Sequence, residues 1–219
     1  MLNKFLPPQW GRIEVGNKIM NTNALFKIGY GLYILSCHEN GKDNACIVNT
    51  VMQVTSNPCK IAICVNKNNH TCTMLKNTRK FNVSILDEEA EFEIFKHFGY
   101  QSGKDVDKFL NFIHTKRTPN GVLYITKNTN AFLSAWVQDE IDLDTHVMFI
   151  AQLVDAEILS DKPTVTYDFY QKNIKPKPEA TASKGWRCKI CGYVYENENM
   201  PADFICPICK HGAVDFEKI

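Results

Sequence analysis

Four cysteines near the end of the 219-residue chain are spaced as two Cys-x-x-Cys pairs, Cys188 with Cys191 and Cys206 with Cys209. Each such pair forms a tight turn that points two thiolates at one metal ion, and two turns complete a tetrahedron. Gly192 follows the first pair, and its tolerance of positive φ lets its amide turn back toward sulfur. The spacing suits iron or zinc. It predicts a metal site that stabilises a segment too short to build a sufficient core alone.

Two polar clusters in the first half of the chain follow strand-like sequence and could bind a planar cofactor. Segment 49–58, NTVMQVTSNP, could face the polar edge of a heterocycle; its candidate residues are Asn49, Thr50, Gln53, Val54, Thr55 and Ser56. Segment 67–71, KNNHT, precedes helix-like sequence, and one phosphate could bind there through Lys67, His70 and Thr71. Each cluster taken alone also fits ordinary turn and helix-cap chemistry.

The sequence around these clusters indicates many short strands and few helices. Segments rich in β-branched and aromatic residues predict strands at 31–37, 60–66, 81–86, 131–141 and 145–159. Capping residues predict three helices, at 24–28 after Asn23, from Asn69 or Thr71 to residue 80, and at 88–98 after Asp87. This pattern favours a closed barrel over βαβ units, so we predict a mainly β fold with a few helices. The chain has no Gly-x-Gly-x-x-Gly and no P-loop motif, which argues against a Rossmann unit.

A lysine- and proline-rich stretch, YQKNIKPKPEATASK at 170–184, separates the barrel-like sequence from the paired cysteines. Alternating lysine and proline favour extended polyproline II backbone. We therefore predict three parts: a domain at 1–170, a linker at 171–184 and a small metal-binding domain at 185–219.

The charge balance argues against several classes of partner. Lysine and arginine number 25 and aspartate and glutamate 24, which leaves a net charge of +1. Such a balance gives no electrostatic footprint for nucleic acid or for an anionic membrane. The apolar runs are too short to span a bilayer, and the first residues lack the apolar region of a signal peptide. We therefore expect a cytoplasmic protein whose clustered cysteines bind metal rather than form disulfides.

The C-terminal segment resembles the rubredoxin family, in particular the shortened rubredoxin domain of rubrerythrins. The likeness rests on Trp186, Cys-x-x-Cys-Gly-Tyr-Val-Tyr, Cys-Pro-x-Cys and Phe216. It implies one iron bound by Cys188, Cys191, Cys206 and Cys209. It also implies that aromatic neighbours exclude water and tune the potential, among them Trp186, Tyr193 and Phe204. The stretch between the pairs is shorter than in a typical rubredoxin, and this short form is also similar to a zinc ribbon.

The larger segment, from about residue 24 to 170, resembles the flavin reductase-like family of FMN-binding split barrels. The likeness rests on both polar clusters, on Gly29-Tyr-Gly-Leu-Tyr, and on the segments FGYQSGKDVDKF at 98–109, Asp144-Thr-His146 and TVTYDFY at 164–170. It implies that segment 49–58 contacts the isoalloxazine and ribityl chain, that segment 67–71 binds the phosphate, and that His146 lies near the flavin. Many members have Thr two positions before Asn49, where this chain has Ile47.

The fusion of these two segments resembles the high-molecular-weight rubredoxins. That resemblance implies a homodimer with FMN and one iron per rubredoxin domain as cofactors. It implies electrons from NAD(P)H, delivered directly or by an NADH-rubredoxin reductase, and a flavo-diiron protein that reduces O2 or NO as the acceptor. The chemistry is consistent, because nicotinamide delivers two electrons together, a mononuclear iron takes one, and a flavin can convert between the two regimes.

Other interpretations stay open at this level. The tail could be a zinc ribbon that binds a partner beside a flavin reductase barrel, or the barrel could hold FMN only as a passive shuttle. Among single residues, His146 could be a core histidine and Lys108 a solvated helix charge. Trp136 fits a core position or a dimer contact, and Cys46 and Cys59 fit buried apolar positions.

Overall fold

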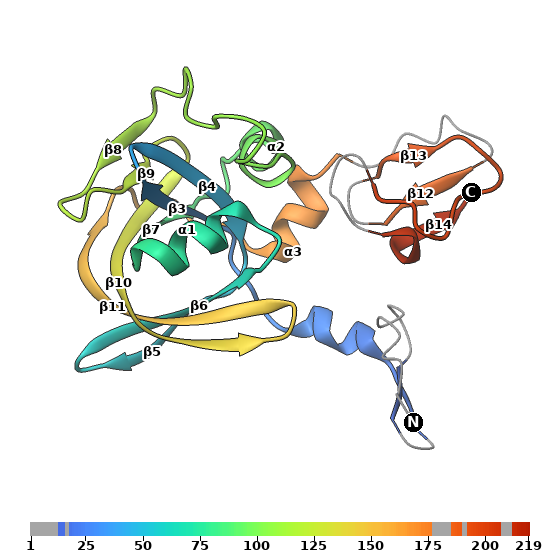
Figure 1. Ribbon diagram of the computed structural model, residues 1–219, viewed down its shortest axis with the longest axis horizontal. Helices are drawn as coiled ribbons and strands as arrows, with labels where there is room; N and C mark the ends of the chain where they lie inside the picture. The colour runs from blue at the N-terminus through green and yellow to red at the C-terminus, as the bar shows by residue number, and fades with distance from the viewer. Residues whose placement is uncertain (1–12, 16–17, 177–184, 190–191, 207–211) are drawn as a thin grey trace. The chain divides into compact units, whose positions relative to one another are not determined.

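The computed structural model describes residues 13–15, 18–176, 185–189, 192–206 and 212–219, and most of its regular structure is β (Figure 1). This confirms the predicted mainly β fold. Residues 30–175 form one compact unit, and the remaining residues are grouped in a second. Before the first unit, β1 (Ile13–Val15) and β2 (Lys18–Met20) pair as a hairpin. A 3-10 helix, η1 (Thr22–Lys27), replaces the α-helix expected at 24–28.

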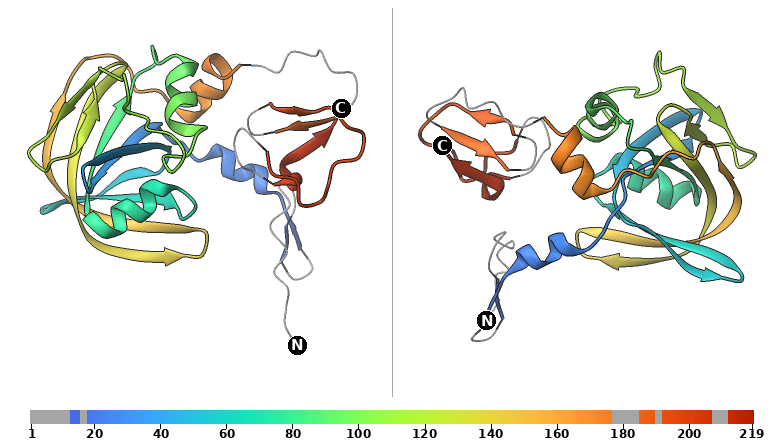
Figure 2. Two further views of the ribbon diagram at one scale, coloured as in Figure 1. Left: turned by 45° about the horizontal axis from the view of Figure 1, so that its top comes forward. Right: turned by 180° about the vertical axis from the view of Figure 1, so that it is seen from behind.

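A seven-stranded antiparallel sheet with the order β4-β3-β7-β10-β11-β6-β5 forms the body of the first unit. Its strands are β3 (Tyr33–Glu39), β4 (Lys42–Val48), β5 (Val51–Ser56), β6 (Cys59–Asn66), β7 (Lys80–Leu86), β10 (Thr129–Leu143) and β11 (His146–Ile158). β4 and β5 lie at opposite edges, although only Asn49 and Thr50 join them in the chain. The sheet therefore curls until its edges meet at this junction, which gives a barrel split along one seam (Figures 1 and 2).

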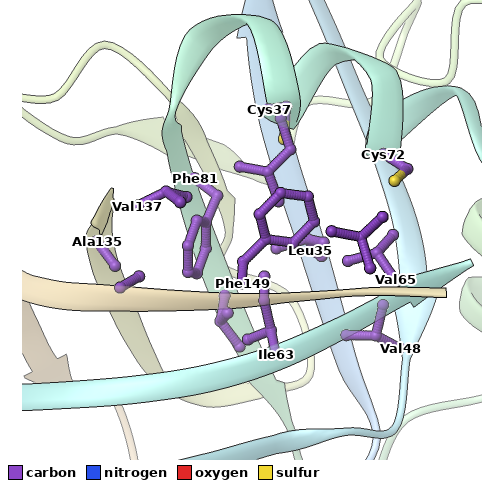
Figure 3. Packing of buried hydrophobic residues seen from close by; sticks show 14 of the residues in the cluster. Leu35, Cys37, Val48, Ile63, Val65, Cys72, Phe81, Ala135, Val137 and Phe149 are labelled. Atoms are coloured by element: carbon purple, nitrogen blue, oxygen red, sulfur yellow. The ribbon is translucent and has the colours of Figure 1, made fainter. Parts of the chain in front are cut away.

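Alternate residues of the strands fill the barrel, because successive side chains of a strand point to opposite faces. β6 and β11 each bury three such residues: Ile61, Ile63 and Val65, and Val147, Phe149 and Ala151. The helix α1 (His70–Thr78), which packs on β3 and β4, adds Cys72, Met74 and Leu75 to the same cluster. Figure 3 shows Cys72 of α1 beside the barrel core, with Cys37 of β3 nearby. Core packing thus fixes the helix that follows β6.

A second apolar cluster lies around α2 (Phe92–Gly99) and includes Ile34, Leu86, Phe95 and Phe98. The short α3 (Tyr167–Phe169) and the π-helix η2 (Tyr170–Ile174) close this cluster, and the hydroxyl groups of Tyr100 and Tyr170 lie 2.9 Å apart. The outer strands β8 (Thr115–Arg117) and β9 (Leu123–Ile125) pair with each other. None of the helices in the described part of the chain is long and apolar enough to cross a membrane.

Two local predictions differ from the structure. The predicted helix after Asp87 begins later, at Phe92, because the Asp87 carboxylate accepts the amide of Glu89 and its backbone bridges Thr164. Residues 171–174 belong to η2, and Ile174 packs against the α2 cluster, so helical structure extends into the segment predicted as linker. Residues 177–184 of that segment lie outside the described residues.

The C-terminal module is built on a three-stranded sheet with the order β13-β12-β14. Its strands are β12 (Trp186–Cys188), β13 (Val194–Tyr195) and β14 (Phe216–Lys218), and the 3-10 helix η3 (Ala213–Asp215) precedes the last of them. Cys188 pairs with Phe216 across β12 and β14. The first predicted ligand therefore lies at the end of a central strand.

Candidate functional site

Three neighbouring strands bring four of the predicted flavin residues to one end of the barrel sheet. The carbonyl of Thr50, just before β5, accepts the amide of Cys64 in β6 at 3.2 Å. At the end of β6, Asn66 pairs with His146 at the start of β11, and the amide of Lys67 donates to the Thr145 carbonyl at 3.0 Å. Asn49, Thr50, Lys67 and His146, separated by up to 97 positions in the sequence, are thus gathered at adjacent strand ends.

Polar and charged contacts connect the residues at this strand end. The Lys67 ammonium lies 2.5 Å from Oδ1 of Asp142, and its hydrogen bond lowers the pKa of that carboxyl. The ring Nδ1 of His146 lies 2.9 Å from the hydroxyl of Thr145. His146 is only half-buried. His146 therefore lies partly exposed at the start of β11, and its role near the flavin stays a prediction.

The side chains of Gln53, Val54, Thr55 and Ser56 are exposed along the edge strand β5. The Thr55 hydroxyl contacts the Pro58 carbonyl, and the Gln53 amide donates to the Thr55 carbonyl at 3.3 Å. At about 3.3 Å per residue, Thr55 lies about 16 Å along the strand from Thr50. The segment can therefore meet a long ligand laid along β5, whose other end would reach the strand end that carries Lys67.

The start of α1 provides backbone amides rather than the predicted Thr71 hydroxyl. Thr71 is only 1% exposed, and its Oγ1 accepts a 2.9 Å hydrogen bond from Nδ2 of Asn44. Asn69 is the N-cap residue but makes no side-chain capping bond. The first amides of a helix carry no intrahelical partner and together with the helix dipole favour an anion. His70, half-buried beside them, has a buried Nδ1 with no partner among the described residues.

Lys108 is buried, which contradicts the alternative of a solvated helix charge. Its ammonium donates to the carbonyls of Ala45 at 2.8 Å and Phe98 at 2.9 Å, and the residue is 3% exposed. Burial lowers the pKa of Lys108, because desolvation disfavours the charged form. The only signal in the sequence was its place in segment 98–109, since neither carbonyl is close enough in the chain to indicate burial.

In the C-terminal module, Cys188 and Cys206 are buried together with Phe216. Aromatic side chains pack around this cluster, and the ring centroids of Phe204 lie 4.6 Å from Tyr195 and 5.4 Å from Phe216. Trp186 also packs there, and its indole donates to the Glu198 carbonyl at 3.0 Å. Two thiols in a shell of aromatic rings fit a water-excluded thiolate metal site. Cys191 and Cys209, the other two predicted ligands, lie outside the described residues.

Both predicted cysteine turns are closed by strand pairing at the same register. Arg187, just before Cys188, pairs with Val194, and Ile205, just before Cys206, pairs with Gly212. The two partners are seven positions apart in each case. Gly192 has φ of +80°, as its place after a cysteine pair predicts, and its amide donates to the Cys188 carbonyl at 2.8 Å. Matching turns of this kind suit the two halves of one tetrahedral site.

Comparison with known proteins assigns both parts of the chain to families. Residues 25–176 match the model of the flavin reductase like domain, and residues 186–217 match the rubrerythrin, rubredoxin-like domain. The chain is 32% identical over 230 residues to the high molecular weight rubredoxin of Moorella thermoacetica, covering 91% of this chain and all of the relative. The chain belongs to the high-molecular-weight rubredoxin family. In this family member, flavin reductase-like and rubredoxin-like sequences follow one another in one polypeptide.

Two further relatives support the first half of this architecture. The ferric-chelate reductase (NAD(P)H) of Archaeoglobus fulgidus is 38% identical over 164 residues, which cover 75% of this chain and 96% of the relative. The structure of NADH:FAD oxidoreductase SgcE6 from Streptomyces globisporus C-1027 superposes with a TM-score of 0.59 at 19% identity, over 65% of this chain and 83% of that one. The second likeness shows the fold alone. The match to the flavin reductase like domain and the ferric-chelate reductase relative show that this high-molecular-weight rubredoxin is a flavin-dependent oxidoreductase.

One departure from the family pattern has a structural account. Ile47, where many flavin reductases have Thr, packs with the apolar cluster around α2. A Cβ placed on Gly99 would lie 3.2 Å from Cγ1 of Ile47, so the two residues are in close contact. The side chain at this position therefore contributes to the second core in this protein.

Proposed function

We propose that this protein carries electrons from NAD(P)H through FMN to a mononuclear iron and on to an external acceptor. The observation that carries the proposal is the presence, in one chain, of a flavin reductase-like domain at 25–176 and a rubredoxin-like domain at 186–217. A bound flavin would supply the conversion of a two-electron input into single-electron output. Anaerobic reduction by NADH, with and without an added NADH-rubredoxin reductase, decides whether nicotinamide reacts directly with the flavin or through a separate reductase.

FMN is the flavin that the described residues fit best. The exposed edge of β5, from Gln53 to Ser56, would lie along the isoalloxazine and ribityl chain. The amides at the start of α1, with Lys67 and His70, would bind its single phosphate. His146 at the adjacent strand end would face the same ligand. The site offers one anion-binding helix start in its described part, which suits a mononucleotide.

Iron is the metal that we propose for the tail, with Cys188, Cys191, Cys206 and Cys209 as its ligands. The buried Cys188 and Cys206, and the aromatic shell around them, support it. The match to a rubredoxin-like domain favours iron over the zinc of a ribbon. The purified protein tests both cofactors: its visible spectrum, extracted flavin and metal content should give about one FMN and one iron per chain. Zinc in place of iron, or a colourless protein, would contradict this proposal.

The acceptor that we propose is a flavo-diiron protein that reduces O2 or NO, as the family resemblance implies. A second candidate activity is direct reduction of ferric chelates by the flavin domain. The 38% identity to a ferric-chelate reductase favours it, because that match covers 75% of the chain. A Cys188→Ser variant separates the two: it should lose transfer to a flavo-diiron protein and keep any reduction of ferric chelates at the flavin.

We also propose a homodimer. Large apolar side chains are exposed on the strands β5, β10 and β11: Met52, Val54, Trp136, Ile141 and Val154. Trp136 is 49% exposed, so the core position considered for it is wrong and the dimer contact is the interpretation that we retain. Sedimentation of the wild type and of Trp136→Glu tests this, with a shift from dimer toward monomer expected for the variant. A wild-type monomer would refute the proposal.

A further inference from the structure

We propose that Asn44 is a positioning residue for the flavin phosphate, held in place by the loop at 100–108. This inference rests on the proposed binding of FMN at the start of α1. Asn44 does not belong to either predicted polar cluster, and no ligand contact is proposed for it. Its carboxamide instead fixes the helix turn whose amides would bind the phosphate.

β4 holds the first turn of α1 through the side chain of Asn44. Nδ2 of Asn44, which is 4% exposed, donates to Oγ1 of Thr71 at 2.9 Å. Thr71 is the second residue of α1, so this bond ties the first turn of the helix to the strand. Because the bond uses the Thr71 hydroxyl, Thr71 would serve the phosphate through its backbone amide.

The loop at 100–108 contacts the same carboxamide through Gly103. A Cβ built on Gly103 would lie 2.1 Å from Oδ1 of Asn44, so only glycine allows this approach. Oδ1 has no hydrogen-bond partner in the part of the chain that the structure describes. Lys108 fastens the end of the loop through the carbonyls of Ala45 and Phe98. Gly103 of the loop thus lies against the Asn44 carboxamide, and that carboxamide holds the first turn of α1 through Thr71.

This arrangement predicts an effect on phosphate binding rather than on flavin binding in general. The contacts of Asn44 lead to α1, whereas the ring-binding residues Gln53 to Ser56 lie on the opposite edge strand, β5. Loss of the carboxamide should therefore lower the affinity for FMN, which has the phosphate. The affinity for riboflavin, which lacks the phosphate, should not change.

The test compares FMN and riboflavin affinities of flavin-stripped, full-length protein by fluorescence titration. Asn44→Ala should lower FMN affinity about three- to tenfold, the size expected for one neutral hydrogen bond, with riboflavin affinity unchanged. Asn82→Ala is the matched control, since Asn82 is also fully buried and donates to a threonine, Thr118, at 2.9 Å. Asn82 lies in a different network, so its variant should lose stability and keep the FMN-to-riboflavin ratio.

Two more variants keep the test decisive if Asn44→Ala does not fold. Gly103→Ala leaves Asn44 and Thr71 chemically intact but displaces the carboxamide, so it should reduce the same ratio. Thr71→Val removes the acceptor, and adding Asn44→Ala to it should cause no further loss. A ratio unchanged in all foldable variants would overturn the role of Asn44 alone. A wild type without preference for FMN over riboflavin would overturn the proposed phosphate site and this inference with it.

Discussion

Lys67 and Asp142, 75 positions apart in the sequence, meet at the strand end that carries the candidate phosphate residues, with 2.5 Å between Nζ and Oδ1. The hydrogen bond from Lys67 lowers the pKa of Asp142, so the carboxylate stays ionised down to acidic pH. An exposed pair of this kind contributes little to stability. In the proposed FMN complex we expect its effect on binding, because the carboxylate would neutralise the cation that faces the phosphate.

Replacing Asp142 by Asn should therefore strengthen FMN binding. The variant leaves Lys67 without its counter-ion, so FMN affinity should rise about two- to fivefold at low salt and less at high salt. Riboflavin affinity should not change. Asp144→Asn is the control, because it removes the same charge two positions away, and Asn tolerates the φ of +57° found there. Equal effects of the two variants would show that Lys67 does not face the phosphate.

The buried Lys108 predicts a pH-dependent stability. Its pKa is lowered in the folded protein, so between that value and about 10.4 the unfolded chain binds more protons. Unfolding free energy attributable to Lys108 should therefore rise as the pH increases through this interval. Denaturant unfolding of wild type and Lys108→Met at pH 7 and pH 10 measures it, since other groups cancel in the difference. The free energy of unfolding of the wild type, relative to that of the variant, should be larger at pH 10 than at pH 7. If the difference between the two proteins does not depend on pH, the burial of the ammonium is contradicted.

Cysteine substitutions should separate the metal site from the barrel. Cys188→Ser should lower the iron content to well under half of the wild-type value and unfold the tail, since small metal domains depend on their metal for folding. Cys59→Ser, at a half-buried cysteine of the barrel, is the control and should keep both iron and flavin. Metal analysis and the visible spectrum give the answer. Full iron content in Cys188→Ser would remove this residue from the ligand set.

The barrel core should be sensitive to truncation at Phe149, which has no exposed surface. Phe149→Ala should lower the free energy of unfolding by about 3–5 kcal/mol, because a large cavity is left beside Leu35 and Phe81. Ile113→Ala, at a side chain that is 82% exposed, should change it by less than about 0.5 kcal/mol. Urea unfolding measures both, and similar losses would contradict the burial of Phe149 in the barrel core.

Local sequence patterns predicted the elements that form this core. Strands at 60–66 and 81–86 are rich in β-branched and aromatic residues, and they appear as β6 and β7 within one residue of these limits. The rubredoxin-like module could similarly be predicted, because cysteine spacing and the position of Gly192 are local signals. The start of α2 was not, since Asp87 has the residue type of a helix cap but uses its carboxylate in a turn and its backbone in a bridge to Thr164.

The orientation of single polar side chains could not be predicted, because it depends on partners far away in the chain. Thr71 was expected to offer its hydroxyl to a phosphate. Instead, that hydroxyl is buried and accepts a hydrogen bond from Asn44, 27 positions earlier. From the sequence, Lys108 could have been a solvated charge. Its ammonium instead donates to the carbonyl of Ala45, 63 positions away. Strand periodicity carries no information on either contact.

Anaerobic stopped-flow reduction of the full-length protein by NADH tests electron transfer from flavin to iron most directly. Flavin absorbance should bleach first, and the visible bands of the ferric tetrathiolate site should then bleach in the same mixture. If NADH alone does not react, adding an NADH-rubredoxin reductase should start the same sequence. Bleaching of the flavin while the iron bands persist would contradict the proposed path.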